Sequence, residues 1–97
     1  MRILTIAEVG VDDEQRLFIR PSSGDFELIY RAAMEVCWDR ATERLSHPAP
    51  RGWTPLRWFQ QITAAMADEY GVQLELTDET IWSNVSADVR SEIESRL

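Results

Sequence analysis

Hydrophobic residues dominate the start of the chain and fall into two alternating sets. Over residues 2–10, one set is Ile3, Thr5, Ala7 and Val9 and the other is Leu4, Ile6 and Glu8, and a shorter apolar stretch follows at residues 17–19. The acidic residues 12–14 between the two stretches are typical of a polar hairpin tip, and Pro21 ends the second stretch because proline has no N–H to donate. This part of the sequence therefore predicts a β-hairpin.

The longest periodic stretch covers residues 26–45, where apolar side chains recur every three or four residues. Ser22 and Asp25 precede it with the spacing of a capping box. Met34 and Trp38 widen the apolar stripe, so the pattern predicts one long helix that is covered on more than one side. The residues of the stripe are Phe26, Ile29, Tyr30, Ala33, Cys37, Ala41 and Leu45.

A second helix and a third strand follow. Thr54 and Pro55 have the residue types of an N-cap and a first-turn proline, and Gly71 is suited to end the helix in a left-handed conformation. Residues 72–76 then alternate strictly between apolar and polar side chains, which predicts a strand with one face in water.

The end of the chain is less regular. Residues 77–84 leave two alternatives open, a short helical piece or an extended piece after a turn, and Ser86 caps a final helix. The predicted order is β-β-α-α-β-α in a single α+β domain over residues 1–97. We expect a three-stranded antiparallel sheet, made of the N-terminal hairpin and the later strand, with two to three helices packed on one face.

The charge of the chain limits its partners. A formal net charge of -7, from 17 acidic residues and ten arginines, argues against nucleic acid, which needs a basic surface. It is compatible with a basic protein partner, although solubility alone also explains an acidic surface. The absence of lysine has two explanations as well: arginine is favoured at interfaces, and a GC-rich coding sequence would produce the same bias.

The residues that usually carry catalysis are scarce. His47 and Cys37 are the single histidine and the single cysteine, and the chain has no glycine-rich phosphate loop or zinc-binding spacing. We therefore expect no catalytic residue, no metal and no cofactor. An enzyme would need Glu35, His47 or Tyr70 to converge on one cleft.

Cysteine usage and hydropathy also bear on location. One cysteine cannot form an internal disulfide, and no apolar run approaches the roughly 20 residues of a membrane span. The first residues lack the apolar core of a signal peptide. These features predict a cytoplasmic protein that does not associate with a membrane.

The strongest binding candidate is the stretch that holds Arg51, Trp53, Arg57 and Trp58, where positive charge and large aromatic rings interleave. Arginine and tryptophan are enriched in interface hot spots. Trp58 lies off the apolar stripe of its helix, so it need not face the core, whereas Trp53 has the alternative of folding back over it. We expect a self-associating, non-enzymatic module, and a variant with both tryptophans replaced by alanine should keep its fold but lose association.

A second hypothesis is a small-ligand or metabolite-binding protein. Its pocket would lie between the long helix and the sheet, lined by Tyr30, Trp38, Trp82 and Phe59. A third candidate, at Arg20 and the serines after it, offers donors to an anion, but Asp25 already supplies negative charge there and favours simple helix capping.

Several segments resemble small proteins encoded by integron gene cassettes. They are residues 3–9 (ILTIAEV), 17–21 (LFIRP), 29–34 (IYRAAM), 58–62 (WFQQI) and 80–85 (TIWSNV). The resemblance implies a compact α+β domain, frequently self-associating and of unassigned function. It implies no catalytic residue.

Overall fold

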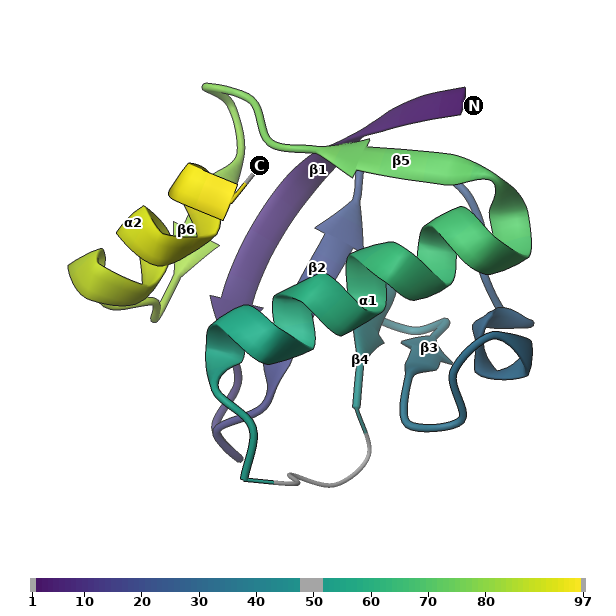
Figure 1. Ribbon diagram of the computed structural model, residues 1–97, viewed down its shortest axis with the longest axis horizontal. Coiled ribbons are helices and arrows are strands. Elements are labelled where there is room, and N and C mark those ends of the chain that lie inside the picture. Colours follow the sequence, from purple (N-terminus) through teal and green to yellow (C-terminus); the bar gives the residue numbers. More distant parts are fainter. Residues whose placement is uncertain (1, 48–51, 97) are drawn as a thin grey trace.

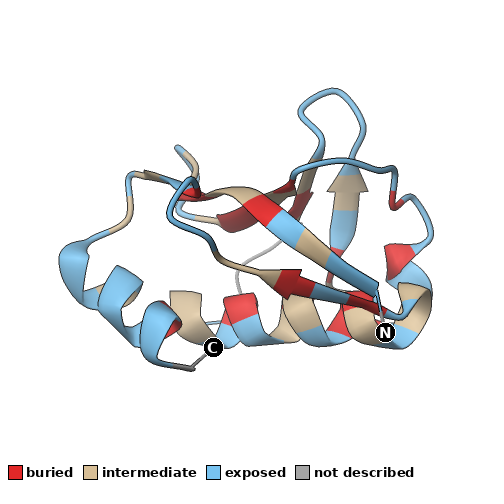
Figure 2. Cartoon of the chain, turned by 90° about the horizontal axis from the view of Figure 1, so that it is seen from above, coloured by how far each residue is buried: buried red, intermediate tan, exposed pale blue. Residues whose placement is uncertain are grey.

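A computed structural model describes residues 2–47 and 52–96 as one sheet with helices on one side (Figure 1). Both α-helices lie on the same side of the sheet, and within the described ranges no helix covers the opposite face (Figure 2). The elements in chain order are β1 (Arg2–Val11), β2 (Leu17–Pro21), the 3₁₀ helix η1 (Ile29–Arg31), β3 (Cys37–Asp39), β4 (Arg44–Ser46), α1 (Pro55–Tyr70), β5 (Val72–Glu75), β6 (Ile81–Ser83) and α2 (Ala87–Arg96).

The described residues form a six-stranded mixed sheet in which β1 is central. On one edge β1 pairs antiparallel with β2, which is followed by β4 and β3. Residues 2–5 of β1 pair in parallel with β5, and residues 8–10 pair in parallel with β6. The predicted three-stranded antiparallel sheet is therefore wrong, although the α+β class stands.

Thr80 joins the two parallel segments that pair with β1. Its hydroxyl donates to the carbonyl oxygen of Ile6 at 2.7 Å, at the point of β1 between the residues paired with β5 and those paired with β6. The hydroxyl oxygen of Thr80 also accepts the N–H of Thr77, at 3.0 Å. Where the backbone pairing of β1 is interrupted, the Thr80 hydroxyl supplies the hydrogen bond that a neighbouring strand would otherwise supply. The buried carbonyl of Ile6 therefore keeps a partner.

Most predicted elements outside the middle of the chain are confirmed. Thr54 Oγ1 accepts the N–H of Arg57 at 3.2 Å as the N-cap of α1, and Gly71 ends that helix in the left-handed region with φ 62°. Ser86 Oγ accepts the N–H of Val89 at 3.2 Å at the start of α2. Within residues 77–84, β6 corresponds to the extended alternative.

The predicted helix over residues 26–45 is wrong. The chain forms η1, a series of turns and the β3–β4 hairpin instead. Phe26, Ile29 and Ala33 are buried and keep a helix-like spacing, which explains the sequence pattern. Leu45 pairs with Ile19, so β4 covers an edge of β2 that a helix would have left without backbone partners.

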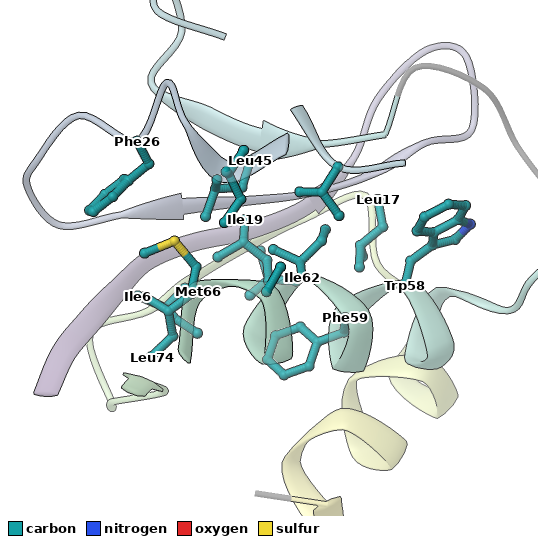
Figure 3. Packing of buried hydrophobic residues seen from close by; sticks show 14 of the residues in the cluster. Ile6, Leu17, Ile19, Phe26, Leu45, Trp58, Phe59, Ile62, Met66 and Leu74 are labelled. Atoms are coloured by element: carbon teal, nitrogen blue, oxygen red, sulfur yellow. The ribbon is translucent and has the colours of Figure 1, made fainter. Parts of the chain in front are cut away.

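The core lies between the sheet and α1 (Figure 3). Trp58, Phe59, Ile62 and Met66 line the inner face of α1, and all are at most 2% exposed. The sheet contributes buried apolar residues from four strands: Ile6, Val9, Leu17, Ile19, Leu45, Val72 and Leu74.

A glycine allows the open face of the sheet to pack tightly. Gly10 lies opposite Phe18 in the β1–β2 pair, and a Cβ atom at Gly10 would lie 2.4 Å from the Phe18 ring. The ring therefore covers the backbone of β1 directly, and Phe18 is buried although no helix covers this side. Among the described residues, no helix is long and apolar enough to span a membrane.

Candidate functional site

The side chains of His47, Trp53, Arg57 and Trp58 form a continuous stack, which we term the aromatic stack. The rings of His47 and Trp58 are parallel within 3°, with centroids 3.8 Å apart. Trp53 packs against Trp58 at 4.5 Å, and the guanidinium carbon of Arg57 lies 4.2 Å from the centre of the Trp53 ring. The stack closes the N-terminal end of α1 over the core.

The aromatic stack is directed inward. Trp58 is 2% exposed and His47 is 1% exposed, and His47 Nε2 accepts the backbone N–H of Leu17 at 3.2 Å. Trp53 is half-buried and has contacts with Trp58 and with Arg57. The expectation that Trp58 need not face the core is therefore wrong, and replacing both tryptophans should damage the fold. Arg51 lies outside the described residues.

The aromatic residues of the predicted ligand pocket lie in separate places. Trp38 is on β3, where its ring meets the edge of Phe26 at 5.3 Å, whereas Trp82 is on β6 beneath the guanidinium of Arg90 at 5.0 Å. Three strands separate β3 from β6. Tyr30 lies on η1 and is 54% exposed. The long helix that was expected to form one wall of the pocket does not exist.

The three residues considered for an enzyme also have separate partners. Glu35 accepts a hydrogen bond from Gln61 at 2.7 Å, and the Tyr70 hydroxyl accepts the N–H of Leu28 at 2.9 Å. His47 contacts Leu17 and Trp58. The contacts of these three side chains thus lead to different residues.

A group of exposed apolar side chains that the sequence pattern assigned to a helix lies around η1. Leu28, Tyr30 and Met34 are 43%, 54% and 87% exposed, and we term them the η1 surface. The segment is anchored from below because Ile29 is fully buried and the Leu28 N–H is bound by Tyr70. The predicted helical stripe places Tyr30 and Met34 toward the interior. Because this segment does not form one long helix, both side chains are exposed to solvent instead.

Charges beside the η1 surface are paired within the chain. Arg31 lies 3.6 Å from Glu69, a residue of α1. Arg40 lies 3.8 Å from Asp25 and also forms an ion pair with Glu27. Both signs of charge therefore lie beside this apolar surface, as two arginines and three acids.

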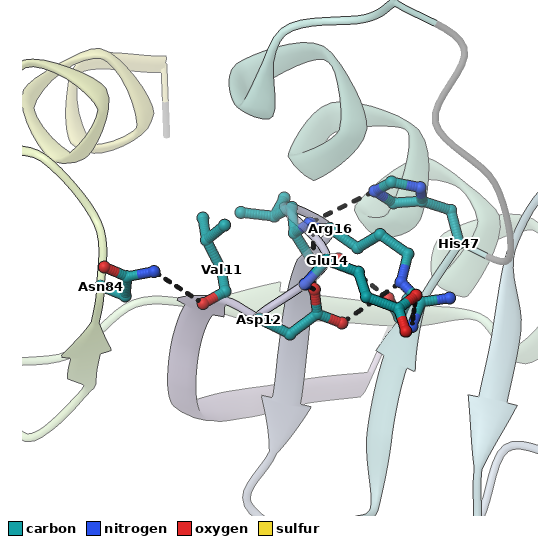
Figure 4. A network of polar contacts seen from close by, with 8 residues as sticks. Val11, Asp12, Glu14, Arg16, His47 and Asn84 are labelled. Carbon is teal, nitrogen blue, oxygen red and sulfur yellow. Dashed lines mark hydrogen bonds and ion pairs between the residues drawn. The ribbon is translucent and has the colours of Figure 1, made fainter.

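The hairpin tip between β1 and β2 is a closed polar network (Figure 4). Asp12 Oδ1 accepts the backbone N–H groups of Glu14 and Arg16, each at 2.9 Å, and the Arg16 guanidinium reaches Asp12 and Glu14 at 3.3 and 2.7 Å. Burial raises the pKa of Asp12, but these hydrogen bonds and the charge of Arg16 outweigh it and lower the pKa. The predicted polar tip is confirmed. Among the described residues no group of acids, histidine or cysteine could hold a metal ion.

A second polar cluster lies on the open face of the sheet. Glu8 accepts hydrogen bonds from the Arg20 guanidinium at 3.2 Å and from the hydroxyl of Ser83. Burial raises the pKa of Glu8, but these two bonds and the charges of Arg20 and Arg44 together lower it below its ordinary value of 4.5. Glu8 is thus held as a carboxylate at the centre of the sheet.

Comparison with known proteins agrees with the resemblance seen in the sequence. Residues 4–80 match the family model of integron cassette protein Hfx_Cass5. The chain is also 40% identical to a solved structure described as integron cassette protein Hfx_Cass5 from the mobile metagenome of the North West Arm Sewage Outfall. That match covers 98% of this chain and 95% of the other, with a TM-score of 0.49. A search of curated proteins gives no match. The predicted resemblance to integron cassette proteins is confirmed.

Proposed function

We propose that this chain, which belongs to the Hfx_Cass5 family of integron cassette proteins, has a non-enzymatic function and self-associates through the η1 surface. The name of the family states no activity, so the proposal rests on the chain's own surface. Its setting is the cytoplasm, because a single cysteine offers no internal disulfide.

The exposure of Leu28, Tyr30 and Met34 supports the proposal most directly. Large apolar side chains gathered on one part of a surface are typical of protein interaction sites, whereas scattered ones are ordinary. Tyrosine and methionine are also enriched in interfaces. The buried residues of the same segment hold these side chains in place, so less conformational entropy is lost when a partner binds.

The charges around the η1 surface favour a second copy as the partner. Two chains of net charge -7 repel each other over most of their surfaces. At the η1 surface Arg31 and Arg40 offset two of the three neighbouring acidic charges. A two-fold contact is self-complementary, so a surface that carries both signs of charge can face its own copy.

The test is the solution mass of the chain and of single-site variants. We expect a dimer by size exclusion with light scattering, and at least a tenfold weaker association for Met34→Glu and for Tyr30→Glu, because each places a charge in the apolar contact. Ile81→Glu is the matched control. Ile81 is also 54% exposed, but it lies on β6, so this variant should associate like the wild type.

A monomer at all concentrations would overturn the proposal, as would a dimer that only Ile81→Glu disrupts. Circular dichroism of each variant shows whether the fold persists.

If the chain also binds a different protein, its excess of acidic residues favours a basic partner. Glu75, Asp78 and Glu94 show this excess locally, since they line one hollow of about 340 Å³.

A further inference from the structure

Among the described residues, His47 is the one titratable side chain that is buried. It directly follows β4, and its ring lies between the start of β2 and Trp58 of α1 (Figure 4). Three elements therefore meet at a group whose charge changes between pH 5 and pH 8 in its ordinary state.

The side chains of Ser46 and His47 extend the contact of β4 with β2 beyond the backbone pairing of Leu45 with Ile19. Ser46 Oγ donates to the carbonyl oxygen of Leu17 at 3.1 Å, and His47 Nε2 accepts the N–H of Leu17 at 3.2 Å. Both backbone groups of Leu17 are thus bound by side chains at the end of β4. Leu17 is itself only 2% exposed, so water cannot readily replace the imidazole as an acceptor.

The bond to Leu17 requires the neutral form of His47. A ring nitrogen that accepts an N–H carries a lone pair and no hydrogen, so the proton of the neutral ring is on Nδ1. Protonation places a second donor, Nε2–H, against the N–H of Leu17. The hydrogen bond is then lost, a buried backbone donor is left unsatisfied, and a charge is held inside the core. Each of these effects opposes the charged ring in the folded chain.

The charged groups around His47 do not favour a positive ring. They belong to the elements that pack on the ring and to the hairpin tip beside it. They are Arg16 with its partners Asp12 and Glu14, Arg44 on β4, and Arg57 on α1. Three of the five are positive, both acids are paired with Arg16, and the first turn of α1 contains no acid. A protonated ring therefore meets an excess of like charge.

The folded and unfolded chains consequently differ in how they bind a proton at His47. In an unfolded chain, histidine binds a proton near pH 6.5, whereas the fold requires the neutral ring. Below about pH 6.5 the unfolded chain thus binds more protons, so a falling pH favours opening of the fold at this residue. Glu8 and Asp12 act at lower pH, because their pKa values are lowered from 4.5 and 3.8.

We propose that His47 is an acid-sensitive switch that holds the end of β4 and the N-terminal end of α1 on β2. When the ring is protonated, the bond to Leu17 breaks and the parallel contact with Trp58 opens. The rings of Trp58 and Trp53, which are packed together at neutral pH, then become accessible to solvent.

The opening is confined to one end of α1. Ile62 and Met66 are fully buried about one and two turns beyond Trp58, and they hold the rest of the helix on the sheet. The switch goes beyond the proposed self-association, because the η1 surface lies beside the other end of α1, where Leu28 contacts Tyr70.

The test follows the ring of His47 and the indole N–H groups by NMR from about pH 7.5 to about pH 5. At neutral pH we expect the nitrogen shifts of His47 to show the Nδ1–H tautomer. Below about pH 6.5 the indole signals of Trp53 and Trp58 should change together with the His47 ring, and the opened population should rise by at most about tenfold for each pH unit, because one proton is bound. Trp38 and Trp82 pack elsewhere, on Phe26 and under Arg90, so their indole signals should stay constant.

His47→Gln is the matched variant. The glutamine side-chain oxygen can accept the N–H of Leu17 but does not titrate, so the indole signals of Trp53 and Trp58 should not depend on pH over the same range. An equal response to pH in His47→Gln would overturn the proposal. If this variant does not fold, the wild type decides alone: indole signals that stay constant down to about pH 5, or a His47 ring that titrates near pH 6.5 without any change in them, would also overturn it.

Discussion

The ring of Trp58 lies between His47 and Trp53 and contacts both inside the chain. Removing a buried aromatic side chain costs about 3–5 kcal/mol, through lost burial and the cavity that remains. We expect Trp58→Ala to lower the free energy of unfolding by that amount in urea denaturation. Trp53→Ala should lower it less, because Trp53 is only half-buried. Equal and small losses in the two variants would contradict this role of the stack.

Glu8 makes the stability of the chain depend on pH. Its pKa is lowered in the folded chain, so near pH 4.5 the unfolded chain binds more protons. The stabilisation is therefore fully present above about pH 4.5 and is lost as the pH falls through the lowered value. We expect Glu8→Gln to be less stable than the wild type at pH 7, with the difference shrinking at pH 3. Asp12 and Asp39 shift in the same direction but are present in both proteins, so the difference isolates Glu8. A difference that stays constant with pH would contradict the prediction.

At the scale of the elements, Thr80 is the link between β5 and β6. Thr80→Val keeps the shape of the side chain but removes the donor to Ile6 and the acceptor for Thr77. Each hydrogen bond contributes about 1 kcal/mol, and an unsatisfied buried group costs about 1–3 kcal/mol. We expect a loss of about 2–4 kcal/mol in urea denaturation. Thr80→Ser, which keeps the hydroxyl, should lose less than half of that. Equal losses would mean that the methyl group, and not the hydroxyl, matters.

The elements that were predicted correctly have residues at their ends that favour those ends in any context. The helix α1 has Thr54 and Pro55 at its start and Gly71 at its end, and these caps act whatever the rest of the chain does. The segment over residues 26–45 has no such end signal. Its helical spacing is real for Phe26, Ile29 and Ala33, but the pairing of β4 with β2 depends on a strand distant in sequence. A local pattern cannot reveal that pairing, because tertiary contacts outweigh helix propensity.

The candidate site was predicted less well, for the same reason. The sequence identified the aromatic residues by type, but whether Tyr30 faces solvent and Trp58 faces the core depends on the whole fold. The bond between His47 and Leu17 had no signal in the sequence. It arises only because β4 lies beside β2.

The whole molecule carries a net charge of -7, which opposes association of two copies. At an ionic strength of about 0.01 M the screening length is roughly 30 Å, and at about 0.15 M it is roughly 8 Å. We therefore expect the dimer to strengthen between these conditions, as measured by sedimentation equilibrium. Weaker association at the higher salt would mean that ion pairs between copies, and not apolar contact, hold the dimer together.

The central place of β1 has a consequence for how the protein is made. Its partners on one edge, β5 and β6, lie far along the sequence, so a chain emerging from the ribosome holds β1 with that edge unpaired until both have been synthesised. Contacts between such distant segments slow folding, and unpaired strand edges invite aggregation in the meantime. The hairpin of β1 and β2 can form early, but the sheet closes only once Ile81–Ser83 have left the exit tunnel.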